Sequence, residues 1–119
     1  SYALYFEDAR EAFGAKFGLA YMTIADNGCF APLVDLSFQY LRPIRYGMKC
    51  RVDIIYRPTE AAKIVFDYEI HSSADDELMA KGRSVQAFMD KQYRLMWYRP
   101  DFYAAWQTRW DVFNNSKQQ

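Results

Sequence analysis

The feature that most constrains this chain is an amphipathic helix predicted over residues 1–19. At 100° per residue, one broad face gathers mostly aromatic side chains: Tyr2, Tyr5, Phe6, Ala9, Phe13 and Phe17. The opposite face is mostly acidic and holds Glu7, Asp8, Glu11 and Ala15. Gly18 is placed to end the helix in a left-handed conformation. Because the phenylalanines carry no polar atom, the aromatic face must be buried against the segments that follow.

Those segments read as strands. Residues 20–29 are predicted to be a connection with turn residues at its end. Apolar and polar residues then alternate along four stretches, 33–41, 49–56, 63–71 and 78–90. Their predicted core faces are Val34, Leu36, Phe38 and Tyr40; Cys50, Val52, Ile54 and Tyr56; and Ile64, Phe66, Tyr68 and Ile70. We expect the four strands to follow one another as a meander, with a hairpin loop over residues 72–77.

The last strand and the C-terminal segment complete the prediction. Ala80, Gly82 and Ser84 share one face of the last strand and would let the helix approach closely. A second helix is predicted from about 100 to 113, because Pro100 followed by Asp101 is a helix-start signal. Its predicted inner stripe is Phe102, Trp106, Arg109 or Trp110, and Phe113, followed by a frayed polar tail from Asn114. The fold class is therefore α+β with an antiparallel sheet.

Composition narrows the function. A chain of 119 residues forms one domain, and its fifteen basic and fifteen acidic residues cancel, which argues against a nucleic-acid partner. No apolar run is long enough for a membrane span. Cys29 and Cys50 read as reduced thiols of a cytoplasmic protein. An aromatic content of 18% is high and indicates extra apolar surface for a ligand or a partner.

Few single residues indicate chemistry. Glu7 is a candidate base, although an acid near a helix start that pairs with Arg10 is the more ordinary interpretation. His71 is read as a surface histidine, since no nucleophile elbow accompanies it, and no residues have metal-ligand spacing. Cys50 alternates with core residues and reads as a packed thiol, while the role of Cys29 stays open.

Three stretches resemble a known family. The residues SY and YFEDAR, at 1–2 and 5–10, resemble the start of the central helix in hot-dog-fold acyl-CoA thioesterases of the 4-hydroxybenzoyl-CoA thioesterase type. The segment FQYLRPIRYGMKCRV, at 38–52, is similar to that family's Tyr-x-x-Pro-x-x-x-Gly-Asp bend, with Met48 at the Asp position. The strand AKGRSVQAFMD, at 80–90, resembles the family's final long strand.

The resemblance implies a fold and an activity. It implies a hot-dog core over residues 1–92, whose first strand would precede Ser1, and a C-terminal extension over residues 93–119. The implied enzyme hydrolyses an acyl-CoA or acyl-carrier-protein thioester, works as a homodimer or homotetramer, and uses no cofactor beyond the coenzyme A of its substrate. The backbone amide of Tyr2 would hold the oxyanion, and the principal catalytic acid would lie about seven residues before Tyr2.

Several residues are candidates for binding the substrate. The aromatic residues Tyr21, Phe30, Phe38 and Tyr40 are candidates for an acyl tunnel, although such residues more often form core. Mobile cations at a groove suit the phosphates of coenzyme A, and the candidates are Arg42, Arg45, Lys63, Lys81 and Arg83. Two alternatives stay open: a non-catalytic hot-dog module that binds acyl thioesters or assembles with partners, and, more weakly, a small RNA-binding domain.

Overall fold

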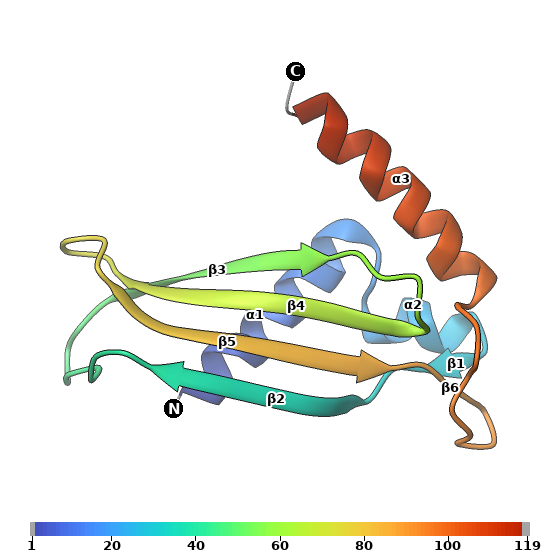
Figure 1. Cartoon of the computed structure of the whole chain (residues 1–119), viewed down its shortest axis with the longest axis horizontal. Coiled ribbons are helices and arrows are strands. Elements are labelled where there is room, and N and C mark those ends of the chain that lie inside the picture. Colours follow the sequence, from blue (N-terminus) through green and yellow to red (C-terminus); the bar gives the residue numbers. More distant parts are fainter. Residues whose placement is uncertain (1, 118–119) are drawn as a thin grey trace.

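The computed structural model describes residues 2–117. Two helices, a run of strands and a long C-terminal helix follow one another along the chain (Figure 1). The elements are α1 (Tyr2–Phe17), α2 (Tyr21–Asp26), β1 (Cys29–Phe30), β2 (Leu33–Tyr40), β3 (Cys50–Arg57), β4 (Lys63–Ser72), β5 (Leu78–Ala87), β6 (Met89–Asp90) and α3 (Asp101–Lys117). Among the helices of this stretch, none combines the length and the apolarity needed to cross a membrane.

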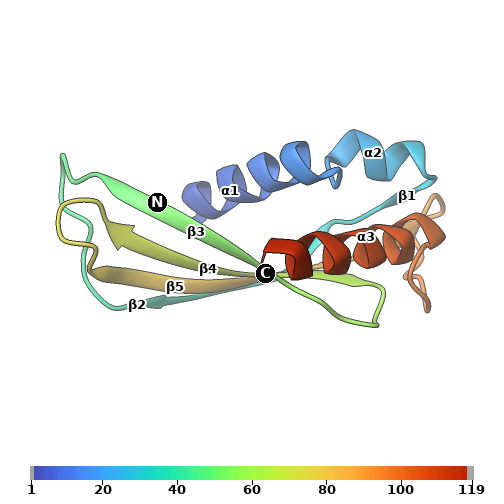
Figure 2. The ribbon, with the colours of Figure 1, turned by 90° about the horizontal axis from the view of Figure 1, so that it is seen from above.

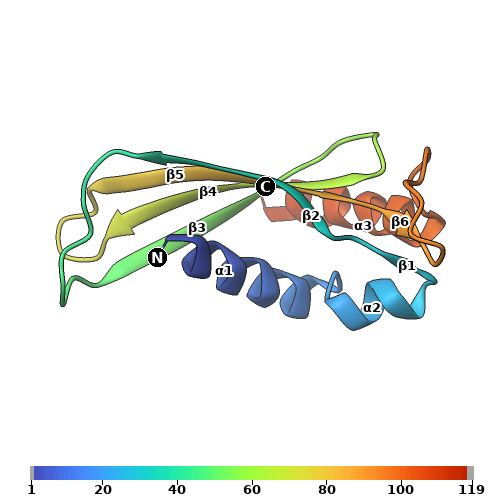
Figure 3. The same cartoon turned by 90° about the horizontal axis from the view of Figure 1, so that it is seen from below.

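Helix α1 forms where the aromatic periodicity predicts it. Gly18 follows its last residue with a φ of +83°, the left-handed conformation that ends a helix at glycine. Phe6 and Phe13 are buried beneath the helix, as predicted. Tyr5 was assigned to the same face but lies at its margin and is partly exposed, so the buried stripe is narrower than predicted. Helices α1 and α2 lie on one side of the sheet (Figures 2 and 3).

The four long strands form one antiparallel sheet in the order β2-β5-β4-β3. The predicted meander is therefore wrong for β2, which pairs with β5 instead of β3. Residues 41–49 carry the chain from one edge of the sheet to the other (Figure 1). The backbone amides of Leu41 and Arg42 both donate to the Met79 carbonyl oxygen at 3.0 Å, so the start of this crossing is held against β5.

Two segments differ locally from the prediction. Residues 20–29 are more than a connection, because they contain α2 and the start of β1. The predicted strand over residues 78–90 is divided in two: β5 ends at Ala87, and β6 pairs with β1 in a separate small sheet. Phe88 lies between them with its side chain fully buried, so the strand is interrupted where this ring enters the core.

The predicted core faces of β3 and β4 are confirmed. The four apolar residues of β4 are all buried: Ile64, Phe66, Tyr68 and Ile70. On β2 only the middle of the face packs, through Leu36 and Phe38. A register shift between Leu33 and Asp35 displaces Val34, and Val34 and Tyr40 are exposed near the ends of the strand. The edge strand therefore carries apolar side chains that the described residues do not cover.

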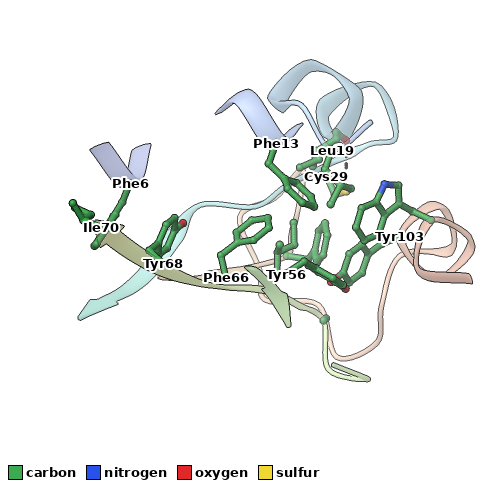
Figure 4. Packing of buried hydrophobic residues seen from close by; sticks show 14 of the residues in the cluster. Phe6, Phe13, Leu19, Cys29, Tyr56, Phe66, Tyr68, Ile70 and Tyr103 are labelled. Carbon is green, nitrogen blue, oxygen red and sulfur yellow. Dashed lines mark hydrogen bonds between the residues drawn. The ribbon is translucent and has the colours of Figure 1, made fainter. Parts of the chain in front are cut away.

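Helix α3 begins as predicted but continues to Lys117, beyond the expected end at residue 113. Its most buried residue is Tyr103, which the predicted stripe omitted. The Tyr103 hydroxyl lies 2.6 Å from that of Tyr56, and the Gln107 amide donates to Tyr56 at 2.9 Å (Figure 4 shows the two rings). The Trp106 indole N–H donates to the carbonyl oxygen of Phe17 at 2.6 Å. These polar contacts hold α3 against both the sheet and α1.

Candidate active site

The start of α1 is the predicted oxyanion site, and α1 begins at Tyr2. The backbone N–H groups of a first helical turn have no partner within the helix and carry a partial positive charge. Ser1 lies outside the described residues, and the predicted catalytic acid precedes it. The role of the Tyr2 amide therefore stays a prediction.

A row of nearly parallel rings underlies this end of α1. Phe6 stacks on Tyr68 of β4 at 4.3 Å between ring centroids and on Phe38 of β2 at 5.2 Å. Phe38 in turn stacks on Tyr40 at 5.9 Å. The row runs from the buried centre of the sheet to its β2 edge, where Tyr40, a predicted substrate-binding residue, is largely exposed. The first turns of α1 are thereby fixed over the sheet between β4 and β2.

A buried hydrogen-bond chain connects α1 to the sheet beside these rings. Arg10 donates from Nη1 to the Tyr68 hydroxyl at 3.3 Å, and this hydroxyl lies 2.6 Å from the Ser84 Oγ. Burial raises the pKa of Tyr68, which keeps the hydroxyl neutral. In the described part of the chain, Arg10 thus has Tyr68 as its partner, and the predicted pair with Glu7 is not found. The sequence periodicity predicted the faces of α1 and β4 on which Arg10 and Tyr68 lie, but it did not predict that the two side chains form a hydrogen bond.

Glu7, the candidate base within the chain, is exposed on the polar side of α1. It lines a hollow of about 330 Å³ with Arg10 and Glu11 of α1, Tyr21 of α2 and Gln86 of β5. Gln86 is held there, because its side-chain amide donates to the Ala31 carbonyl oxygen at 2.8 Å. The hollow is open to solvent and is large enough for a small polar group. Glu7 can therefore reach water.

Two of the predicted phosphate-binding cations are held by carboxylates. Arg42 forms an ion pair with Glu77. Arg83 donates to both carboxylate oxygens of Asp67, at 2.7 and 3.0 Å, and Arg57 adds a contact of 2.8 Å from the other side. The Arg83 guanidinium, more than the Arg57 one, lowers the pKa of Asp67 below its ordinary value. Both predicted cations thus have a structural partner.

The other three predicted cations lie in separate places. Arg45 lines a hollow of about 660 Å³ between the 41–49 connection and the turn after β4. Lys81 lines one of about 340 Å³ together with Gln39, Arg57 and Glu69. Lys63 borders a groove beside residues 95–97. Since these groups do not converge, the structure does not gather the predicted cations into one phosphate site within a single chain.

His71 differs from its prediction as a surface residue. Its side chain is only 15% exposed, and its Nε2 lies 3.2 Å from Glu69 and 3.7 Å from Asp53. Glu69 lies two residues before His71 on β4, whereas Asp53 is brought beside it by the pairing of β3 with β4, which alternation along one strand does not reveal. No group of potential metal ligands is found among residues 2–117.

The cysteines do not offer a nucleophile. Cys29 is buried, its thiol donates to the Ile24 carbonyl oxygen at 3.6 Å, and burial raises the pKa of the thiol. A thiol with a raised pKa is a poor source of the reactive thiolate. Cys50 packs against the core from β3, as predicted, and both cysteines are unpaired.

Comparison with known proteins supports a single family. The chain is similar to YneP of Bacillus subtilis (strain 168), named as an acyl-CoA thioesterase, with 27% identity over 90% of this chain and 80% of that protein. It is also similar to the chloroplastic acyl-acyl carrier protein thioesterase ATL3 of Arabidopsis thaliana, with 28% identity over 78% of this chain. The matched part spans about half of ATL3, 49% of its length.

Solved structures agree with this fold. The DHNA-CoA thioesterase from Staphylococcus aureus superposes with a TM-score of 0.77 and 25% identity, over 97% of this chain and 79% of that one. The hypothetical protein TT1821 from Thermus thermophilus gives a TM-score of 0.73 and 26% identity over 90% of this chain and 81% of that one. The model of the thioesterase-like superfamily matches residues 1–107. The chain therefore belongs to the thioesterase-like superfamily, and its fold is the hot-dog fold of thioester-hydrolysing enzymes.

Proposed function

We propose that this protein hydrolyses acyl thioesters of coenzyme A or of a carrier protein at the start of α1. The observation that carries the proposal is the match of the thioesterase-like superfamily over residues 1–107. The names of YneP and ATL3 support the two substrate classes. The polarised amides of a helix start are suited to the negative charge that a thioester oxygen acquires during attack.

The proposed reaction needs water and no cofactor. A carboxylate removes a proton from water, the resulting hydroxide adds to the thioester carbonyl, and the Tyr2 amide donates to the oxyanion. When the tetrahedral intermediate collapses, the carbon–sulfur bond breaks and the thiolate takes the proton, which gives a free acid and a thiol. The principal base is the acid predicted before Ser1, and Glu7 is the alternative within the chain.

We further propose that the protein is a dimer formed along the outer edge of β2. This edge has no neighbouring strand in the described part of the chain, and exposed apolar side chains lie at both of its ends: Leu33 and Val34 at one, Tyr40 and Leu41 at the other. An antiparallel pair of β2 strands related by a two-fold axis would place each group opposite the other. The start of α1, which contacts β2 through Phe6 and Phe38, would then lie beside the interface.

The same geometry divides the predicted substrate-binding residues into one for the acyl group and others for coenzyme A. Tyr40 lies at the proposed interface, where an acyl group would enter. Arg45, Lys63 and Lys81 are exposed, so they are the better candidates for coenzyme A phosphates. Arg42 and Arg83 would first have to leave Glu77 and Asp67. The two unpaired thiols agree with a reducing compartment, and we place the protein in the cytoplasm.

The test is hydrolysis by the full-length protein of acyl-CoA thioesters and of one acyl-carrier protein, with the released thiol detected by a thiol reagent. We expect turnover of at least one of these substrates. Replacing the acid predicted before Ser1 by Ala should lower kcat by two orders of magnitude or more, in keeping with loss of a general base. Tight binding of acyl thioesters without hydrolysis would instead favour the non-catalytic module.

A further inference from the structure

The segment between β6 and α3 has an unusual surface. Residues 91–99, KQYRLMWYR, form what we call the aromatic loop. Trp97 is 91% exposed and Tyr98 is 84% exposed, and Tyr93 and Leu95 are also largely exposed. Large apolar side chains at such exposure are costly to leave in water and mark interaction surfaces when they gather in one place. The loop lies at the end of the sheet away from the start of α1 (Figure 1).

The loop is held in this conformation by many hydrogen bonds. The Met96 amide donates to the Phe88 carbonyl oxygen at 2.9 Å, and Leu95 forms a bridge with Met89. Asp90 accepts from the Arg94 backbone amide at 3.1 Å and from its side chain at 3.2 Å. Met96 packs inward on the core, so its neighbours Leu95 and Trp97 both face outward. The outward display is therefore built into the fold and needs no opening of the structure.

An apolar groove continues the exposed surface. A hollow of about 480 Å³ lies between the loop and the strands, lined by Ala61, Ala62, Lys63, Ala87, Leu95, Met96 and Trp97. Alanine and large apolar side chains make up its wall, and Lys63 is its one charged member. The groove is thus apolar, and the ammonium group of Lys63 lies at its margin.

All charged side chains of the aromatic loop are positive. Lys91, Arg94 and Arg99 are its charged residues, and residues 91–99 contain no Asp or Glu. Arg94 is neutralised by Asp90 and Arg99 donates to Gln107. Lys63, which lines the groove with Trp97, and Lys91, two residues before Tyr93, are exposed. Tryptophan and tyrosine beside lysine and arginine is the combination that anchors proteins at the headgroup level of a bilayer.

We propose that the aromatic loop docks this protein on the surface of an anionic lipid bilayer. Trp97 and Tyr98 enter the headgroup region, Leu95 and the groove contact acyl chains, and Lys63 and Lys91 contact lipid phosphates. The docking is peripheral and reversible, since a few apolar side chains and two cations give only modest affinity. The inference does not depend on the proposed hydrolysis, because vesicle binding is measured without a thioester.

Intrinsic fluorescence provides a direct test. Of the three tryptophans, Trp106 is buried and Trp110 is half-buried, so Trp97 is the one whose surroundings a surface contact would change most. Vesicles that contain phosphatidylglycerol should shift the emission of the full chain to shorter wavelength, and the protein should sediment with them. Pure phosphatidylcholine vesicles should give little of either effect. In Trp97→Phe the shift should disappear while most of the binding remains.

Variants separate the apolar part from the charged part. Trp97→Ser combined with Tyr98→Ser should weaken vesicle binding at least tenfold, and Lys91→Gln should weaken it about fivefold at low salt. Tyr46→Ser is the matched control and should leave binding unchanged, since Tyr46 is fully exposed and the 41–49 connection that carries it lies at the opposite end of the sheet (Figure 1). Circular dichroism of each variant checks that the fold is kept.

Three outcomes would overturn the proposal. Binding that is equal on neutral and anionic vesicles would remove the role of charge. Binding that survives the Trp97→Ser, Tyr98→Ser variant would place the contact elsewhere. An emission shift that appears with rising protein concentration in the absence of vesicles would assign the aromatic loop to a second copy of this chain.

Discussion

The ring of Phe6 lies directly against the α-carbon of Gly82, in the space that a β-carbon would occupy. This contact sets the distance between α1 and the centre of the sheet. Ala80 and Ser84, on the same face of β5, are fully buried. The predicted row of small residues is therefore the surface of the sheet that α1 approaches. Glycine is required at position 82 for this approach, and its conformational freedom is not what matters there.

Gly82→Ala should therefore destabilise the fold by about 1–3 kcal/mol, the usual cost of overpacking a core. Denaturant titration measures it, with Lys81→Ala, the adjacent exposed position, as a control expected to change little. Combining Gly82→Ala with Phe6→Leu should cost less than the two changes added together, because the smaller side chain relieves the overlap. Strict additivity would mean that the two residues do not touch.

Phe13→Ala should cost about 3–5 kcal/mol, because Phe13 is buried among rings from three elements. Its ring lies 4.9 Å from Phe66 and 5.4 Å from Trp110 between centroids. Leu4→Ala, an exposed position on the same helix, should cost well under 1 kcal/mol. Comparable losses in the two variants by denaturant titration would show that α1 is not the buried centre of the fold.

Local periodicity predicted much of this architecture, for a clear physical reason. The alternation in β4 and the spacing of Phe6 and Phe13 in α1 record which side of each element meets the core. The strand order is a different kind of information: β2 and β5 are far apart in the chain, and no local pattern states that they pair. The short pairing of β1 with β6 was missed for the same reason.

In the candidate site, too, local features could be predicted from the sequence and contacts between elements could not. The buried face of α1 and the small residues of β5 follow from sequence patterns. The hydrogen-bond chain from Arg10 through Tyr68 to Ser84 could not be predicted, because it depends on which side chains meet across different elements. The same holds for the burial of Tyr103 against Tyr56. Nothing in the sequence distinguishes the hydroxyl groups of Tyr68 and Tyr103 from those of other tyrosines. A tyrosine at a core position, where phenylalanine would pack equally well, is the one available hint of a buried hydrogen bond.

Asp67 should make the stability of the protein fall in acid. Its pKa is lower in the folded chain than the unfolded value of about 4, so its contribution is present above pH 4 and is lost as the pH falls through the folded pKa. Asp67→Asn should therefore lower stability at pH 7 and flatten its decline below pH 4. Asp35→Asn, an exposed change on β2, is the control in denaturant titrations at pH 3 and pH 7. Equal acid sensitivity of Asp67→Asn and the unchanged protein would contradict the role of Arg83.

Val34→Lys should convert the proposed dimer into a monomer without unfolding it. Val34 is exposed on the edge strand β2, and a two-fold pairing of this edge would bury the added charges. Light scattering after size exclusion should give half the mass of the unchanged protein. Val112→Lys places the same charge on an exposed position of α3 and should leave the mass unchanged. A monomer already present before substitution, at micromolar concentration, would remove the dimer proposal.

Glu7→Gln should leave most of the thioesterase activity in place. The carboxylate is exposed on the polar side of α1, and it lies beyond the first turn of the helix, where none of the acidic residues is found. A general base, in contrast, contributes about a hundredfold to ten-thousandfold. The measurement is kcat and KM for acyl-CoA hydrolysis by the full-length protein, with Glu11→Gln as the control, since Glu11 lines the same hollow.

The result decides between two positions for the base. If Glu7→Gln lowers kcat at least a hundredfold at unchanged stability and Glu11→Gln does not, the base lies on α1, and water reaches it through the hollow that Glu7 shares with Arg10 and Gln86. If both variants keep their activity while the acid predicted before Ser1 is essential, attack comes from the side of the helix start. In that case the Tyr2 amide and the base act on the same thioester from one end of α1, and Glu7 takes no part in the reaction.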